Sequence, residues 1–400
     1  MKKIFFVDEH KVVNYAGGVE RVICSFANEF VQRGYDIGIV CMDMEKGKPF
    51  FSLDERVSFF NLCFDNQGRR TFGGMTWFLK KIMKEVLRAI CGAKMILMGH
   101  KIHDPKKEYY FKEFAMRLHQ LIEKEKPDLL ISISADSAMI IQRALGGESI
   151  PIIAMCHVDP QYIVHEYNEE QIEAWKKCKF IQVLMGRFRE SFSDIGIKHV
   201  VRIPNAVTQF ANNEMCDLSI THHRIITAGR LDGAGKRQHL LIEAFAKIAK
   251  KYPEWTVHIY GNVANKRYKK RLDRLIQEQG LNKRVFFEGV TDNIIDVYRA
   301  SDIFVFPSEY EGFGLALAEA MSVGLAVVGC KDCTAVSELL NEDCGELVAP
   351  DAQSMAEGLE KLIESSEQRT YYGKKAHERA EEFSPDLIWS QWESLIKKVI

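Results

Sequence analysis

The chain has 400 residues, of which 46% are hydrophobic and 27% charged, and its formal net charge is −1. This length favours two domains, and the near-neutral charge argues against a general basic surface for nucleic acid, which we do not expect as a partner. The ten cysteines lack the spacing of a small disulfide framework, so we expect a cytoplasmic protein. Apolar runs fall short of the roughly 20 residues that a membrane-spanning helix needs.

The first part of the chain alternates apolar strands with helical patterns. The run Lys3–Val7 stops at Asp8-Glu9-His10, too early for a signal peptide, so we predict a first strand there. Residues 19–33 have helical spacing and end at Gly34, which predicts a helix with a glycine at its end. Further strands of the buried, parallel type are predicted at 36–42, 128–132, 151–156 and 180–183.

A second series of strands and helices follows residue 207. Its strands are predicted at 224–228, 256–260, 284–287, 303–306 and 326–329, with helices at 238–250 and 314–323. The polar segment 208–223 reads as an interdomain linker. This alternation predicts an α/β protein with two open parallel sheets, each covered by helices on both faces.

Residues 69–107 differ from the rest because basic residues alternate with large apolar ones. The cations include Arg69, Arg70, Lys80, Lys81, Lys84 and Lys107, and the apolar residues include Phe72, Trp77, Phe78, Leu79 and Ile82. A basic amphipathic segment can attach to an anionic membrane surface. The alternative is a helix packed on its own domain with a solvated basic face.

The strongest motif runs from Ser308 to Met321, at the turn from an apolar strand to a helix. Glycines at such a turn let backbone approach a ligand, and free N–H groups at a helix start suit a diphosphate. Glu311 and Glu319 are eight residues apart, which on a continuous helix is about 12 Å. That is roughly the span from the hexose to the ribose of a sugar nucleotide. A solvated acid at a helix start is the alternative for Glu311, but the whole string favours a ligand site.

A second motif, Gly229-Arg230 to Lys236, lies on a glycine-rich turn after a predicted strand. Arg230 and Lys236 can both grip a diphosphate, one as a planar fork and the other as a point charge. The pattern is no Walker loop, because Arg237 stands where that motif has serine or threonine. Without the first motif, a structural or solvated role would be equally acceptable.

Three weaker signals lie elsewhere in the chain. Gly17-Gly18 lies at the start of a predicted helix, where a phosphate could reach the free N–H groups, although most glycine pairs only form tight turns. His157 follows a strand at the edge where ligands bind in open α/β sheets, although a lone histidine is more often structural. Cys330 and Cys333 form a Cys-x-x-Cys without a second ligand pair, so we interpret it as structural rather than as a zinc or redox site.

Together these residues resemble glycosyltransferase family 4, a retaining family with the GT-B fold, over nearly the whole chain. Val201–Val207 is similar to the family's interdomain Ile-Pro-Asn-Gly-Val stretch, with Ala206 in place of glycine. Phe383-Ser384-Pro385 is similar to the start of its terminal helix. The loop 333–337 lacks the glycines that are common in the family, which puts phosphate contacts by that loop in doubt.

The resemblance implies a domain plan and a set of site residues. Residues 1–207 would bind the acceptor, 208–382 the donor, and 383–400 would return as a helix to the first domain, with a central cleft between the two sheets. The residues implied in catalysis are His157, Arg230, Lys236 and Glu311. The residues implied in donor binding are Gly17, Gly18, Gly261, Val290, Gly312, Phe313, Gly314, Leu315 and Glu319.

The implied activity is retaining transfer of a hexose-type sugar from a nucleotide diphosphate sugar, UDP-linked rather than GDP-linked, to a glycan or lipid-linked acceptor. Protein cations would replace a metal ion, so we expect neither cofactor nor metal. We expect a cytoplasmic enzyme of cell-surface polysaccharide or glycolipid synthesis, with segment 69–107 on the inner face of the membrane. A non-catalytic GT-B partner subunit and a GT-B phosphorylase or epimerase are the alternatives.

Overall fold

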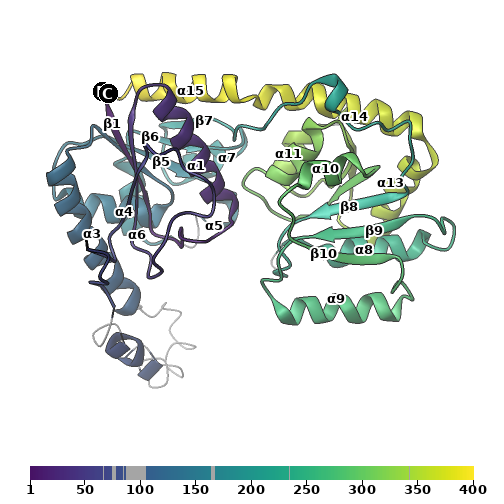
Figure 1. Ribbon diagram of the computed structural model, residues 1–400, viewed down its shortest axis with the longest axis horizontal. Coiled ribbons are helices and arrows are strands. Elements are labelled where there is room, and N and C mark those ends of the chain that lie inside the picture. Colours follow the sequence, from purple (N-terminus) through teal and green to yellow (C-terminus); the bar gives the residue numbers. More distant parts are fainter. Residues whose placement is uncertain are drawn as a thin grey trace. The chain divides into compact units, whose positions relative to one another are not determined.

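The computed structural model describes residues 1–65, 67–73, 78–83, 85–86, 105–163, 167–233, 235–341 and 343–400. The chain divides into two compact units (Figure 1). Unit 1 holds Met1–Val183, Arg189–Val201 and Glu393–Ile400, and unit 2 holds Leu184–Phe188 and Arg202–Trp392. We expected the first domain to extend to residue 207 and segment 383–400 to return to it.

Unit 1 is built on a seven-stranded sheet with the order β3-β2-β1-β4-β5-β6-β7. The strands are β1 (Lys3–Asp8), β2 (Asp36–Cys41), β3 (Ser58–Asn61), β4 (Leu129–Ser132), β5 (Ile152–Cys156), β6 (Phe180–Val183) and β7 (Val200–Arg202). Each neighbouring pair from β3 to β6 is parallel. Because β1 pairs with both β2 and β4, the strand order reverses at β1, which is where open α/β sheets bind ligands.

Helices flank the sheet of unit 1, with α1 and α3 on different sides of it (Figure 1). These helices include α1 (Gly18–Gln32), α3 (Pro105–Glu125), α4 (Ala135–Leu145), α5 (Pro160–Ile163), α6 (Glu169–Lys176) and α7 (Phe188–Asp194). On α1, Phe26 lies on the buried face, and its ring centroid is 4.9 Å from that of Phe6 on β1. Gly34 has a φ of +86°, the left-handed conformation that favours glycine after a helix.

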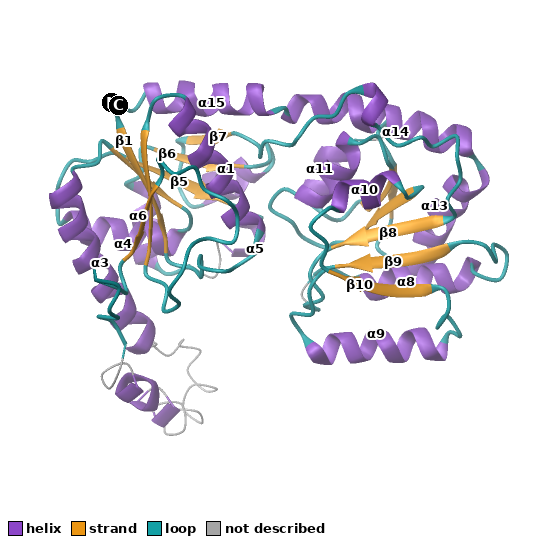
Figure 2. Cartoon of the chain, viewed as in Figure 1, coloured by secondary structure: helices purple, strands orange, loops and turns teal. Residues whose placement is uncertain are grey.

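Unit 2 is built on a six-stranded sheet with the order β10-β9-β8-β11-β12-β13, and all its neighbouring strands are parallel. Figure 2 shows β8, β9 and β10 as orange arrows that run the same way. The strands are β8 (Arg224–Ala228), β9 (Thr256–Tyr260), β10 (Val285–Gly289), β11 (Ile303–Phe306), β12 (Ala326–Cys330) and β13 (Glu346–Val348). The helices are α8 (Gln238–Ile248), α9 (Lys266–Glu278), α10 (Ile294–Arg299), α11 (Leu315–Ser322), α12 (Thr334–Leu340), α13 (Ala352–Glu364) and α14 (Ser366–Ala380).

The last helix, α15 (Pro385–Lys397), begins in unit 2 and ends in unit 1. Within unit 1, Glu393 near its end pairs with Arg33 beyond α1, with 2.9 Å between Oε2 and Nη1. Two short 3₁₀ turns lie in unit 2, at Asn212–Glu214 and at Glu381–Phe383. Within the described parts of the chain, every helix is too short or too polar to span a bilayer.

The predicted pair of parallel sheets is confirmed, and every predicted strand is present with small shifts at its ends. Central strands such as Ile303–Phe306 are buried along their whole length, as expected for a parallel sheet covered on both faces. The sequence analysis missed β3, β7 and β13, which are only three or four residues long. Segment 208–223, which we expected to link the domains, lies within unit 2.

Candidate active site

Two backbone loops meet at the carboxyl ends of β8 and β9 in unit 2. The Gly229 N–H donates to the Tyr260 carbonyl at 2.9 Å, and the Leu231 N–H donates to the Asn262 carbonyl at 3.0 Å. A Cβ at Gly261 would lie 2.1 Å from the Gly229 carbonyl oxygen, and its φ is +141°. Gly261 therefore permits a close backbone approach that a larger residue would prevent.

Lys236 at the end of the glycine-rich turn forms an ion pair with Glu311. Its side chain folds back along the turn, since its Cδ lies 3.7 Å from the position of a Cβ at Gly229. The Glu309 N–H donates to the Gly235 carbonyl at 2.7 Å, which ties the turn to the loop after β11. Because β8 and β11 are neighbours in the sheet, the two strongest motifs of the sequence share one edge.

Arg237 holds these two loops together, a role that the sequence analysis did not assign. Its Nε donates to the Pro307 carbonyl at 2.8 Å, and its Nη2 donates to the Ser308 carbonyl at 3.0 Å. The same guanidinium makes two hydrogen bonds of 2.8 Å to the carboxylate of Asp332, after β12. Arg237 thus connects the ends of three strands, and its backbone has a φ of +44°.

The loop after β11 carries Glu311 and ends at Gly314, whose φ is +86°. Helix α11 begins at Leu315, so Glu311 and Glu319 do not lie on one continuous helix. The 12 Å spacing derived from helical rise is therefore wrong, because the residues from Glu311 to Gly314 form a loop. Glu319 lies on α11 and is buried.

The remaining donor-site candidates of unit 2 differ in exposure. Phe313 is buried and packs edge-on against Phe383, with ring centroids 5.4 Å apart, which indicates a packing role for its side chain. Gly312 and Leu315 flank it, both partly exposed. Arg230 is 53% exposed on its side chain and lies 3.6 Å from the carboxylate of Asp232. Val290, directly after β10, is exposed.

The candidates in unit 1 lie at the carboxyl edge of its sheet. Gly17 precedes α1 and Gly18 is its first residue. A Cβ at Gly17 would lie 2.0 Å from a carboxylate oxygen of Glu20 and 2.8 Å from the Tyr15 ring, so a larger residue there would displace these two side chains. His157 follows β5, and burial lowers the pKa of its imidazole to about 4. The ring is therefore neutral near pH 7 and can hydrogen-bond a sugar hydroxyl.

The Cys-x-x-Cys pair and the possible metal ligands are separate from the motifs described above. Cys330 and Cys333 are buried free cysteines, and burial raises the pKa of the Cys330 thiol to about 12, which agrees with the structural interpretation. Among the described residues, two groups are close enough to hold a metal ion. They are Asp8, Glu9 and His10, and the exposed His119, Glu123 and Glu148. Both groups lie in unit 1.

The basic segment 69–107 is described in part, and Trp77, Lys84 and residues 87–104 lie outside the described residues. Phe72 is buried against Tyr109 and Tyr110, as the packing alternative predicted. Two of the expected free cations are paired: Arg69 lies 2.9 Å from Asp65, and Lys107 lies 2.8 Å from Asp136.

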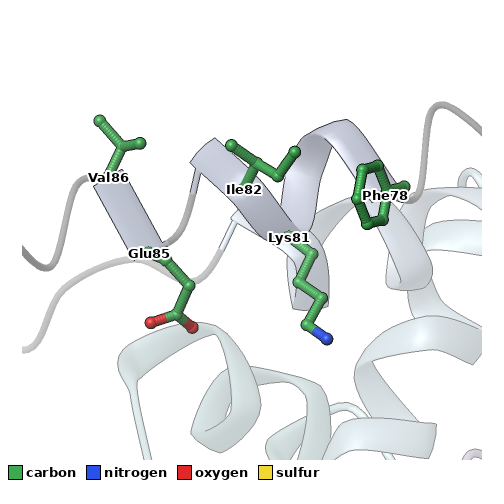
Figure 3. A pocket seen from close by; sticks show the side chains of 5 residues that line it. All are labelled: Phe78, Lys81, Ile82, Glu85 and Val86. Carbon is green, nitrogen blue, oxygen red and sulfur yellow. The ribbon is translucent and has the colours of Figure 1, made fainter.

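Residues 78–86 contradict that packing alternative, because their large apolar side chains face outward. The exposed fractions are 55% for Phe78, 56% for Leu79, 45% for Ile82, 39% for Met83 and 48% for Val86. Figure 3 shows the five side chains that line a pocket on this segment, Phe78, Lys81, Ile82, Glu85 and Val86, with Lys81 and Glu85 pointing away from Ile82 and Val86.

Residues 220–379, which lie in unit 2, match the family model of glycosyl transferases group 1. Unit 2 is a glycosyl transferases group 1 domain. The match covers the glycine-rich turn, Lys236, Glu311 and Glu319. It confirms the predicted class of enzyme, a glycosyltransferase, and it is compatible with the finer assignment to family 4, which stays a prediction.

Two curated relatives align with nearly the whole of this glycosyltransferase. An exopolysaccharide phosphotransferase of Streptomyces coelicolor is 26% identical over 96% of this chain, and the chain spans 40% of that relative's length. The second relative is an uncharacterised glycosyltransferase of Haemophilus influenzae. It is 23% identical, and the alignment covers 99% of this chain and 100% of the relative's length.

The fold of the glycosyltransferase is also found in solved structures. HepE from Anabaena, crystallised with UDP and glucose, superposes with a TM-score of 0.73 at 19% identity over 99% of this chain and 100% of its own. This likeness confirms the predicted GT-B fold, with two Rossmann-like domains. The roles assigned to individual site residues stay predictions.

Proposed function

We propose that the protein transfers a hexose-type sugar, with retention, from a nucleotide diphosphate sugar to a glycan or lipid-linked acceptor. The observation that carries this proposal is the Lys236–Glu311 pair, set among glycine turns at the carboxyl edge of the unit 2 sheet. A cation there suits the diphosphate, and a carboxylate beside it suits sugar hydroxyls. The HepE structure with UDP supports UDP rather than GDP as the nucleotide.

In the proposed reaction, the bond between the anomeric carbon and the diphosphate oxygen breaks. The acceptor oxygen forms its bond to the same face of that carbon, and the acceptor proton passes to the departing diphosphate. Lys236 and Arg230 stabilise the charge that grows on the diphosphate, so a metal ion is not needed. Glu319, buried on α11, accepts hydrogen bonds from the ribose hydroxyls.

A panel of UDP-, GDP- and ADP-sugars tests the donor assignment through thermal unfolding, because a ligand that binds the folded state raises its stability. We expect UDP-sugars to raise the unfolding temperature most. If no nucleotide sugar shifts it, the proposal fails. A donor-hydrolysis assay then separates an enzyme from a non-catalytic partner subunit. Product analysis separates sugar transfer from the phosphotransferase activity named for the Streptomyces relative.

We further propose that residues 78–86 attach the protein to an anionic membrane surface, which would bring the enzyme to a lipid-linked acceptor. Five large apolar side chains are exposed there together, and water contact disfavours such a cluster. Lys80 and Lys81 lie between them, and each cation near an anionic surface can add about 1 kcal/mol. The combination of apolar and basic groups fits a lipid surface better than a neutral protein partner.

Sedimentation with vesicles tests this attachment. The protein should pellet with vesicles that contain phosphatidylglycerol and stay in the supernatant with phosphatidylcholine alone, and added salt should weaken binding. Changing Lys80 and Lys81 to Glu should reduce binding. Changing the exposed Lys177 and Lys179 to Glu is the matched control. Failure to pellet with anionic vesicles at low salt would disprove attachment and favour a soluble acceptor.

A further inference from the structure

A group of polar side chains lies where three strands of the unit 1 sheet end. The proposed reaction gives no role to its carboxylates. Asp8 ends β1 and Glu9 follows it, Ser134 follows β4, and His157 follows β5. Because β1, β4 and β5 are consecutive neighbours, these residues share the carboxyl edge at the point where the strand order reverses. Ligands of open α/β sheets bind at this edge.

The two carboxylates of this group are buried, and within the described chain only one oxygen of each accepts a hydrogen bond. The Asp8 side chain is 0% exposed and that of Glu9 is 5% exposed. Asp8 Oδ1 accepts the His10 N–H at 2.9 Å, and Glu9 Oε1 accepts the Ser134 hydroxyl at 2.6 Å. The second oxygens, Asp8 Oδ2 and Glu9 Oε2, have no hydrogen-bond partner among the residues that the structure describes.

A third buried polar atom lies in the same group. His157 Nε2 is buried and also has no hydrogen-bond partner within the described ranges. Burial lowers the pKa of this imidazole, while the charge of Asp8 acts in the opposite direction, which indicates that the two side chains are close. A buried polar atom without a partner is unfavourable, so three of them at one edge favour the binding of a polar ligand there.

The carboxylates of this group determine which chemical groups a ligand must bring to it. Two carboxylate oxygens would repel a phosphate and attract O–H or N–H donors. His10 Nδ1 lies 3.2 Å from Asp8 Oδ1 and 3.3 Å from Glu9 Oε1, so these two oxygens already face the imidazole. The other oxygen of each carboxylate therefore faces the ligand, and a divalent metal ion at the same carboxylates is an outcome that the test below separates.

We propose that Asp8 and Glu9 form a subsite for the hydroxyl groups of an uncharged sugar ring. This assignment rests on the proposed sugar transfer, and it names the class of ligand that binds at the carboxyl edge of the unit 1 sheet. The ring could come from either of the two substrates, the donor hexose or the terminal sugar of the acceptor. In both cases, phosphate groups of the substrates bind elsewhere.

Binding measurements on the full chain can test the subsite with isosteric variants. Asp8→Asn and Glu9→Gln replace one carboxyl oxygen by an amide NH₂ while keeping side-chain size. Glu125→Gln is the control, because Glu125 pairs with Lys3 at the opposite end of β1. The probes are UDP, three UDP-sugars (glucose, galactose and N-acetylglucosamine) and the methyl glycosides of those sugars, with calorimetry for the nucleotides and saturation-transfer NMR for the glycosides.

We expect UDP to bind all four proteins equally. At least one sugar probe should bind Asp8→Asn or Glu9→Gln about tenfold more weakly, as expected for the loss of a charge-assisted hydrogen bond. A loss for UDP-sugars places the donor hexose at the subsite, and a loss for methyl glycosides places the acceptor sugar there.

The opposite results are equally clear. If both variants bind every sugar probe as the wild type does, the subsite is wrong, while normal UDP binding leaves the proposed function intact. If UDP and its sugars bind none of the proteins, the proposed function itself fails. If Mn²⁺ or Zn²⁺ binds the wild type and not Asp8→Asn, the group is a metal site and the sugar subsite is overturned.

Discussion

Lys236 and Glu311 form an ion pair although 75 residues separate them in the chain. The pair lies where the glycine-rich turn after β8 meets the loop after β11, and the Lys236 ammonium is 5.8 Å from the centroid of the Phe306 ring. In the proposed reaction the bound diphosphate replaces Glu311 as the ion-pair partner of Lys236. Glu311 is then released to accept hydrogen bonds from the sugar.

Glu319→Gln should weaken the binding of free UDP, because an amide accepts ribose hydrogen bonds less strongly than a carboxylate. We expect a loss of about tenfold in affinity by calorimetry. Glu278→Gln, at the exposed end of α9, should bind UDP normally. Equal affinity in the wild type and Glu319→Gln would remove Glu319 from the nucleotide site.

Sugar transfer should survive excess EDTA, because Lys236 and Arg230 supply the positive charge that a metal ion gives in other transferases. Initial rates with and without chelator measure this directly. Complete loss with EDTA, restored by Mg²⁺ or Mn²⁺, would contradict the metal-free mechanism. The residues to change next would then be Asp8 and Glu9, which belong to one of the two possible metal-binding groups of the described chain.

The Arg237–Asp332 pair should contribute to the stability of unit 2. The pair is bidentate, and the Arg237 side chain is mostly buried. We expect Asp332→Ala to lower the free energy of unfolding by about 1–2 kcal/mol. A double-mutant cycle with Arg237→Ala isolates the pair from the carbonyl contacts of Arg237. A coupling energy near zero would show that the pair is not stabilising.

His157 should make the protein less stable in acid. Its pKa is about 4 in the folded protein against 6.5 for an unperturbed imidazole, so the unfolded state binds more protons between these values. The contribution of neutral His157 is therefore complete above pH 6.5 and declines as the pH falls towards 4, by on the order of 3 kcal/mol at most. Denaturant unfolding of the wild type and His157→Gln across this range should show a steeper decline for the wild type. Parallel curves would contradict it.

The sequence predicted those parts of the molecule that depend on local patterns. Continuous apolar runs located the buried strands of both sheets, and the motifs around Lys236 and Glu311 define the candidate site in unit 2. The structure then placed both motifs at neighbouring strands, β8 and β11. Helical rise misled the estimate between Glu311 and Glu319, because a loop residue with positive φ, Gly314, precedes the helix.

The sequence did not predict features that depend on contacts between residues far apart in the chain. Arg237 served only to exclude a Walker loop, since nothing local indicates that Asp332 would meet its guanidinium. Asp8 and Glu9 were interpreted only as the end of an apolar strand, because burial without a partner is a property of the folded edge. An amphipathic pattern likewise does not tell whether its apolar face is covered, and the exposure of Phe78 decided that question.

The most direct test of the account is the turnover of a UDP-sugar by the wild type, Lys236→Ala and Arg230→Ala at saturating donor. Lys250→Ala, an exposed lysine after α8, is the control. We predict that the first two variants lose roughly 10²–10³ in turnover, as expected for the loss of a group that stabilises the transition state, while the control keeps its rate. Turnover close to that of the wild type in both Lys236→Ala and Arg230→Ala would contradict the diphosphate role on which the proposed function rests.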